Sequence, residues 1–234
     1  MSDHIAKAYD QDIAQLKAML AEMGGLAEEQ LDNAIIALTK RDLTLADQVI
    51  RGDEKLDQLE RQIEEKAILT IAKRQPVALD LREIVVAIRV AADIERIGDL
   101  AKNTAKRAHA IPEGLPRKLS AGLLRMGAMA QMQLTDILDA FIRQDADKAM
   151  AVWRSDEDLD ALFNSIFREL LTYMMEDPRN ITMCTHLLFG AKNLERIGDH
   201  TTNIAENIYF LIHGKTITEG RPKKDVTAMM NLAE

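Results

Sequence analysis

The chain has 234 residues, of which 47% are hydrophobic and only 4% aromatic, and its formal net charge is −8. An acidic chain has no general electrostatic attraction to nucleic acid or anionic lipid, so we expect no nucleic-acid partner. The single cysteine, Cys184, excludes an intramolecular disulfide framework, and with no recognisable signal peptide or membrane-spanning apolar run the sequence predicts a cytoplasmic protein without direct membrane insertion.

Three helices are predicted in the first half, because residues that favour helix are abundant and the aromatic residues that favour strands are scarce. Apolar residues recur at helical spacing from about residue 5 to 40, and Gly24-Gly25 weaken the middle of this helix. A short helical turn over 43–50 precedes a second helix from about 53 to 73. The third helix is predicted from about 79 to 108.

The stretch AIPEGLPRK at 110–118 ends this set of helices, since residues that precede proline avoid the helical region. Three more helices are predicted beyond it, over about 118–144, 155–176 and 179–212. The polar stretch that follows lacks periodicity, which is typical of a flexible tail. The predicted units are therefore 1–112, 113–213 and a tail over 214–234.

The two units are copies of each other. MGGLAEEQL at 23–31 matches MGAMAQMQL at 126–134 at an offset of 103, whereas ERIGD at 95–99 recurs at 195–199 at an offset of 100. Three residues are therefore missing from the second copy, and we expect the shortening in the link near Pro178, because loops tolerate changes of length. Duplication of a three-helix unit predicts an all-α fold of two tandem, pseudo-symmetric three-helix bundles.

Acidic residues four apart recur in both copies and are predicted to share one helix face. In the first copy they are Asp53 and Asp57 at the predicted start of the second helix, and Glu95 and Asp99 in the third, where Asn103 extends the row. The second copy repeats this pattern with Asp156, Asp160, Glu195, Asp199 and Asn203. Antiparallel packing would gather four carboxylates in each bundle, and such hard oxygen ligands suit magnesium, calcium, manganese or iron.

Two plainer interpretations compete with a metal site. Acid pairs at this spacing are common on solvated helix faces, and Asp53 and Asp156 are well suited to cap the N-termini of the second helices. Capping does not account for the other six acids. Like charges four residues apart destabilise a helix by about 0.2–0.5 kcal/mol per pair, so arginine, solvent or a metal must offset the repulsion. Arg96 and Arg196 are candidates for that role, or for holding an anion.

A carboxylate-bridged metalloenzyme of the helical-bundle type is an alternative function, because iron or manganese on clustered carboxylates can support catalysis. Such bundles usually carry a histidine three residues after the glutamate, whereas Gly98 and Gly198 occupy those positions here. Both glycines are costly inside helices, which predicts that another helix crosses close to them. His200 points away from the acid row and is predicted to lie on the surface.

The doubled motif (D/N)-hydrophobic-ERIGD-xxx-N resembles the PhoU family, as do LxxMG at 20–24 and NIAENIYFLIHGK at 203–215, and the resemblance spans residues 5–213. It implies two bundles related by pseudo-symmetry, with iron, manganese, magnesium or zinc held on surface carboxylate clusters. The metal ligands that it implies are Asp53, Asp57, Glu95, Asp99, Asp156, Asp160, Glu195 and Asp199. Asn103 and Asn203 match the motif asparagines.

The resemblance also implies a regulatory adaptor with no reaction of its own. Members of the PhoU family restrain high-affinity phosphate uptake and repress phosphate-starvation signalling when phosphate is plentiful. The partners implied for this chain are the ATPase subunit of a phosphate ABC transporter, a phosphate-sensing histidine kinase, and a second copy of the chain in a homodimer.

Overall fold

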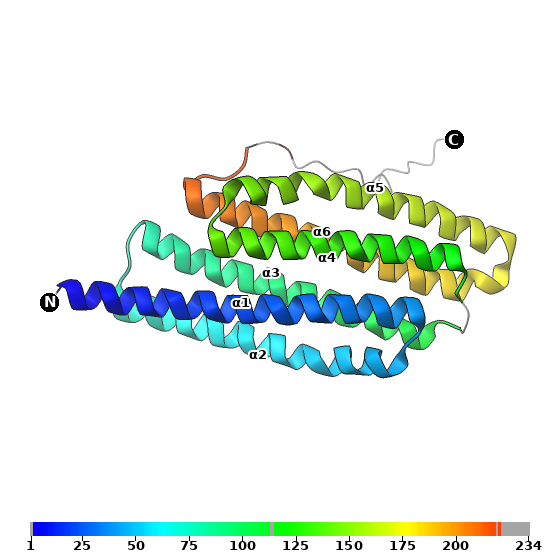
Figure 1. Ribbon diagram of the computed structural model, residues 1–234, viewed down its shortest axis with the longest axis horizontal. Helices are drawn as coiled ribbons and strands as arrows, with labels where there is room; N and C mark the ends of the chain where they lie inside the picture. Colours follow the sequence, from blue (N-terminus) through cyan, green and yellow to red (C-terminus); the bar gives the residue numbers. More distant parts are fainter. Residues whose placement is uncertain (1, 113–114, 219, 221–234) are drawn as a thin grey trace.

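Two three-helix bundles lie side by side in the part of the chain that the computed structural model describes, residues 2–112, 115–218 and 220 (Figure 1). In chain order the helices are α1 (Ser2–Lys40), α2 (Leu43–Arg74), α3 (Leu79–Arg107), α4 (Arg117–Arg143), α5 (Ala146–Glu176) and α6 (Ile181–His213), with 3-10 turns at Ala108–Ala110 and Pro178–Asn180. Helices α1–α3 form one bundle and α4–α6 the other, and the bundles meet along α1 with α4 and α3 with α6. The predicted all-α fold of tandem bundles is confirmed.

The second helix of each bundle begins earlier than predicted. The residues expected to form a separate turn belong to α2, which starts after Asp42, and α5 likewise starts after Asp145 rather than near residue 155. Each of these aspartates caps its helix, accepting a hydrogen bond from Leu45 N at 3.0 Å or from Lys148 N at 2.9 Å. Asp53 and Asp156 therefore lie in helix interiors, and the prediction that they could be N-caps is wrong.

The expected shortening of the second helix–helix link is also wrong. The links run over 75–78 in the first bundle and 177–180 in the second, so their lengths are equal. The missing residues are instead absorbed by the helices, because α5 is one residue shorter than α2 and α6 begins closer to its ERIGD motif than α3 does.

The α1–α4 contact is reciprocal, as expected of two copies related by pseudo-symmetry. A Cβ added at Gly24 would lie 2.9 Å from the Leu138 side chain, and one added at Gly127 would lie 2.7–2.9 Å from the Ile35 side chain. Gly24 and Gly127 are equivalent in the repeat, and so are Ile35 and Leu138. The helix α1 continues through Gly24 and Gly25, and the close approach to Leu138 accounts for the first of these glycines.

Helix α6 ends at Gly214, which has a φ of 71° and whose N–H bonds to Phe210 O at 2.9 Å. The Arg82 guanidinium of α3 donates to the carbonyl of Leu211 at 3.2 Å, so the first bundle holds the end of the second. Most of the predicted tail, residues 219 and 221–234, lies outside the described residues. Among the helices that are described, none is both long enough and apolar enough to cross a membrane.

Gly127→Ala should lower the free energy of unfolding by about 1–2 kcal/mol, because its Cβ would overlap the β-branched Ile35 side chain, which has little freedom to move away. Gly25→Ala is the matched control: nothing lies within 4 Å of a Cβ there, so helix propensity should raise stability by about 0.5–1 kcal/mol. Urea denaturation of the parent and both variants measures the two effects. A stable Gly127→Ala variant would show that α1 and α4 do not require this close approach.

Candidate functional site

The eight predicted ligands lie on α2 and α3 in one bundle and on α5 and α6 in the other, and the helices of each pair pack against each other. Four of these acids are buried: Asp53, Asp156, Asp160 and Glu195 are 6%, 1%, 3% and 4% exposed. A solvated helix face does not describe these side chains. Burying a carboxylate is costly unless a cation, a proton or hydrogen bonds compensate for the lost water, so each cluster needs such a group.

Gly98 and Gly198 bring the helices of each pair together. A Cβ at Gly98 would lie 2.3 Å from the Leu56 side chain of α2, and one at Gly198 would lie 2.6 Å from the Leu159 side chain of α5. The prediction that another helix crosses close to these glycines is confirmed. The acids of the two helices act on each other across the crossing: in addition to burial, the charge of Asp99 raises the pKa of Asp53, and that of Asp160 raises the pKa of Glu195.

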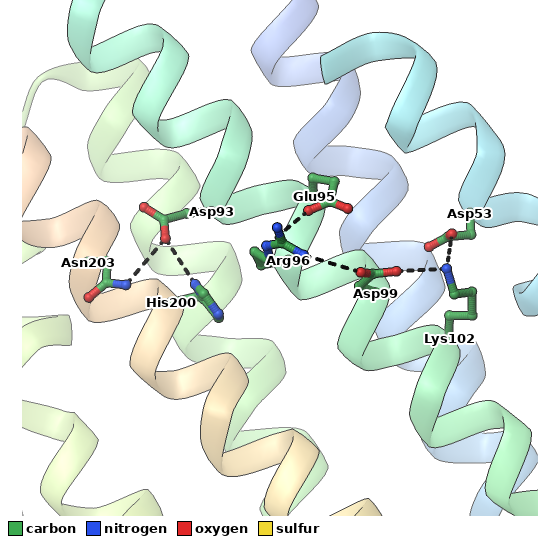
Figure 2. A network of polar contacts seen from close by, with 8 residues as sticks. All are labelled: Asp53, Asp93, Glu95, Arg96, Asp99, Lys102, His200 and Asn203. Atoms are coloured by element: carbon green, nitrogen blue, oxygen red, sulfur yellow. Dashed lines mark hydrogen bonds and ion pairs between the residues drawn. The ribbon is translucent and has the colours of Figure 1, made fainter. Parts of the chain in front are cut away.

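The first cluster comprises Asp53, Asp57, Glu95 and Asp99. Lys102 of α3 lies within it and donates from Nζ to Asp53 Oδ2 and, at 2.7 Å, to Asp99 Oδ1 (Figure 2). Arg96 lies 3.5 Å from Glu95 and 3.6 Å from Asp99, but its side chain is 63% exposed and these contacts contribute little. Lys102 is therefore the main positive charge within the first cluster.

The pKa values of this cluster follow from burial and from Lys102. Burial raises the pKa of Asp53 by more than the hydrogen bond from Lys102 lowers it. Burial alone would lower the pKa of Lys102, but its hydrogen bonds to Asp53 and Asp99 reverse the direction and raise it well above its usual range. The lysine thus stays charged, and the chain supplies the first cluster with its own cation.

The second cluster comprises Asp156, Asp160, Glu195 and Asp199, and it is more deeply buried than the first. Lys192 Nζ lies 2.9 Å from Glu195 Oε1, and the lysine side chain is 39% exposed, at the edge of the cluster. The residue equivalent to Lys102 is Thr202, whose hydroxyl donates to the backbone carbonyl of Asp199 at 2.8 Å. Burial, followed by the charges of Asp199 and Asp160, raises the pKa of Glu195 to about 7, although Lys192 acts in the opposite direction.

Two buried glutamines, Gln30 of α1 and Gln133 of α4, were not singled out from the sequence. They are 8% and 3% exposed, and their side-chain oxygens receive no hydrogen bond within the described ranges. A Cβ at Gly198 would lie 3.3 Å from Gln133 Oε1 and 2.7 Å from Asp156 Oδ1, so both oxygens border the same point beside the second cluster. The repeat contained the signal, since Gln30 and Gln133 match at the offset of 103.

Asn203 and His200 contact the other bundle. His200 Nδ1 lies 2.9 Å from Asp93 Oδ1 of α3, and Asn203 Nδ2 donates to the same oxygen at 3.3 Å (Figure 2). The His200 side chain is 18% exposed, so its predicted surface position is wrong: contact between α3 and α6 covers it. Asn103 accepts from Lys106 Nζ at 3.4 Å, and Arg196 is exposed.

Among the described residues, no three His, Cys, Asp or Glu side chains are grouped closely enough to hold one metal ion. The donor chemistry of the second cluster nevertheless fits a hard cation, because carboxylate and amide oxygens are its preferred ligands. Glu195 Oε2 and Gln133 Oε1 are buried oxygens that accept no hydrogen bond in the described structure. In the first cluster Gln30 Oε1 is the equivalent buried oxygen, and Lys102 bonds two of the acids there.

Glu195→Gln should change how stability depends on pH. Because the folded state raises the pKa of Glu195 from 4.5 to about 7, the folded chain keeps a proton there that the unfolded chain releases. The free energy of unfolding of the parent should therefore fall as the pH rises from about 4.5 to about 7 and then level off. The variant lacks this part of the slope and should gain roughly 1–3 kcal/mol relative to the parent above pH 7.

Urea denaturation of chelator-treated protein between pH 4.5 and 8 measures this difference. Glu176→Gln, an exposed acid on α5, is the control and should keep the parental slope. Identical slopes in the parent and Glu195→Gln would contradict the assigned environment of Glu195.

Comparison with known proteins agrees with this arrangement. The model of the PhoU domain matches residues 20–108 and 123–208. Two relatives named phosphate-specific transport system accessory protein PhoU homolog are 54% identical (Rhizobium meliloti; 97% of this chain, 96% of the relative) and 51% identical (Caulobacter vibrioides NA1000; 97% and 99%).

Two solved structures share the fold. The crystal structure of PhoU from Pseudomonas aeruginosa superimposes with a TM-score of 0.85 at 39% identity, covering 88% of this chain and 100% of that one. The phosphate transport system regulatory protein PhoU from Streptococcus pneumoniae gives a TM-score of 0.83 at 27% identity, covering 90% and 100%. With two matched domains, one per bundle, and relatives that align over nearly its whole length, the chain belongs to the PhoU family.

Proposed function

We propose that this chain is a metal-binding regulatory adaptor that restrains high-affinity phosphate uptake and represses phosphate-starvation signalling when phosphate is plentiful. The names of its relatives, accessory proteins of a phosphate-specific transport system, support the pathway. Membership of the PhoU family supports a regulatory role in phosphate transport rather than a chemical reaction.

The burial of the second cluster is the observation that carries the metal-binding part of this proposal. Asp156, Asp160 and Glu195 are each at most 4% exposed, and the nearest lysine to Glu195 lies at the edge of the cluster. Carboxylates on facing helices are a recurrent way for helical bundles to hold metals. A divalent or trivalent cation such as iron, manganese, magnesium or zinc would neutralise these acids and draw their side chains together.

The surroundings of the acids support an adaptor over a bundle-type metalloenzyme. The position three residues after each motif glutamate is Gly98 or Gly198, and both glycines are packed against leucines. His200, the histidine nearest in sequence to the second cluster, is engaged with Asp93 of the other bundle. Neither copy therefore places a histidine ligand where carboxylate-bridged bundle enzymes usually carry one.

An adaptor requires surfaces for its partners, here the ATPase subunit of the phosphate transporter, the phosphate-sensing histidine kinase and a second copy of the chain. Many exposed apolar side chains lie near the two helix–helix links, at opposite ends of the molecule (Figure 1). Near the α2–α3 link they are Ile68, Leu69, Val77, Leu79 and Leu81, and near the α5–α6 link they are Leu171, Met175 and Ile181. Exposed apolar groups of this kind favour protein contacts.

Deletion of the gene should derepress a phosphate-starvation reporter in cells grown with ample phosphate, and the intact gene should restore silence. Asp160→Asn combined with Glu195→Gln should fail to restore it, because these changes remove two buried anionic donors from the second cluster. Reporter activity and the metal content of the purified protein are the two measurements.

Asp158→Asn combined with Glu176→Gln is the matched control, since it makes the same change of net charge at exposed positions of α5. It should restore silence as the parent does. A silent reporter in the deletion strain would contradict the proposed regulatory role. Full complementation by Asp160→Asn combined with Glu195→Gln would show that regulation does not require these buried acids.

A further inference from the structure

Three side-chain nitrogen atoms are buried and take part in no hydrogen bond among the described residues, and all three belong to α3 or α6. They are Arg107 Nε, His186 Nδ1 and Asn193 Nδ2. A buried donor without an acceptor is costly, and the cost is greater when the donor belongs to a charged group such as a guanidinium. A ligand that brings acceptor atoms to this part of the α3–α6 contact would remove that cost.

Arg107 and His186 lie opposite each other where α3 packs on α6. The two helices run in opposite directions, and Asp93 of α3 contacts His200 of α6 (Figure 1). Arg107 lies fourteen residues after Asp93, close to four helical turns. His186 lies fourteen residues before His200, so it reaches the same level from the other helix. The Arg107 guanidinium also lies over the ring of Phe189, 5.1 Å from its centre and one turn of α6 from His186.

The sequence around this pair supplies no acid to compensate Arg107. The chain has 38 acidic residues against 30 lysines and arginines, yet the stretches 100–112 and 178–194, which carry the pair, contain neither Asp nor Glu. Asp47 of α2 approaches the end of α3, but it is engaged with His109 at 3.0 Å. A guanidinium held between two helices without a carboxylate favours an anion from outside the chain.

The pair occurs in one half of the molecule only. At the offset of 100 that relates α3 to α6, the residue equivalent to Arg107 is Asn207, whose Nδ2 donates to the backbone carbonyl of Asn203 at 3.0 Å. The residue equivalent to His186 is Val86, which is fully buried. The other half therefore packs α3 on α6 with a satisfied amide and an aliphatic side chain, so packing of the repeat does not account for Arg107 and His186.

We propose that Arg107 and His186 form a binding site for a phosphate group, with Phe189 at its entrance. The planar guanidinium presents several N–H donors that match phosphate oxygens, and the imidazole donates from Nδ1 in one neutral tautomer and in its charged form. Phe189 is 51% exposed, so the site is open to solvent on that side. The phosphate is either the free inorganic ion or part of a nucleotide whose base lies on the Phe189 ring. The inference uses none of the acids and does not rest on the metal binding or the regulatory role proposed above.

Isothermal titration calorimetry of the full-length chain tests the site, with inorganic phosphate in one series and AMP in the other, in chloride buffer at constant ionic strength. At least one of the two should bind the parent saturably, at a single site per chain. Arg107→Gln should weaken binding about tenfold or more, because the charge and its N–H donors are lost. His186→Leu should weaken it about fivefold to tenfold through the loss of one donor to a charged group.

Arg89→Gln is the matched control. It makes the same substitution on the same helix, and Arg89 also lies over a phenylalanine ring, that of Phe210, at 5.8 Å. Its affinity should stay within about twofold of the parent, since it lies at the other end of α3. Arg107→Lys keeps the charge but not the planar donors and should bind between the parent and Arg107→Gln, which decides the question should the glutamine variant unfold.

Phe189→Ala separates the two sources of phosphate. Tighter binding of AMP than of inorganic phosphate, lost in Phe189→Ala, would assign a nucleotide, whereas equal binding of both that survives this change would assign the free ion. Absence of saturable binding of either ligand by the parent, or equal affinities of the parent and Arg107→Gln, would overturn the site. Neither result alters the expected derepression of the starvation reporter, so this inference and the proposed function can fail separately.

Discussion

Close packing of helices at glycine is the constraint on which both the joining of the bundles and the placement of the acids depend. Gly24 and Gly127 allow α1 and α4 to approach each other. Gly98 and Gly198 allow α2 and α5 to approach α3 and α6, the helices that carry ERIGD. None of these positions has room for a methyl group unless a neighbouring side chain moves. Each motif glycine immediately precedes the motif aspartate. The contact that packs the helices therefore also fixes where along the helix axes the acids face each other. The five residues ERIGD thus supply both a packing position and charged side chains.

That packing buries carboxylates close to one another, which is electrostatically unfavourable, and the compensation differs between the two copies. In the first bundle an ammonium on the same helix compensates the acids. In the second, deeper burial raises the pKa of Glu195 to about 7, so near neutral pH a proton is one available compensation.

Periodicity and the internal repeat were sufficient to predict the fold class, because long amphipathic helices with few prolines leave little choice of architecture. The helix starts were harder to predict. Asp42 and Asp53 are both residues that can cap a helix, and Gly52 lies between them. The structure continues the helix through Gly52, since Ala46 and Val49 are buried and packing of the first turns outweighs the cost of one glycine.

The acid rows could be predicted from helical spacing, but the side chains that decide their chemistry could not. Spacing alone did not indicate that Lys102 reaches across to α2, because a lysine on a helix surface has many rotamers and most lead to solvent. Gln133 is one apolar-flanked polar residue on a buried face, and its relation to Gly198 depends on how α4 packs on α6. Charge compensation thus depends on contacts between helices, which follow from the packed structure and not from spacing within one helix.

The hydrogen bonds between the bundles lie beside the two ERIGD motifs. Asp93 lies two residues before the motif glutamate of the first copy, while His200 and Asn203 lie one and four residues after the motif aspartate of the second, Asp199, on α6 (Figure 2). The residue equivalent to Asp93 in the second copy is Asn193, so only the first copy has an acid at this position. A change that shifted α6 at the second cluster would strain contacts to the helix that carries the first. The duplicated unit has kept its helix packing at Gly98 and Gly198 while the charged residues around the motif have diverged, with Lys102 and Asp93 in the first copy against Thr202 and Asn193 in the second.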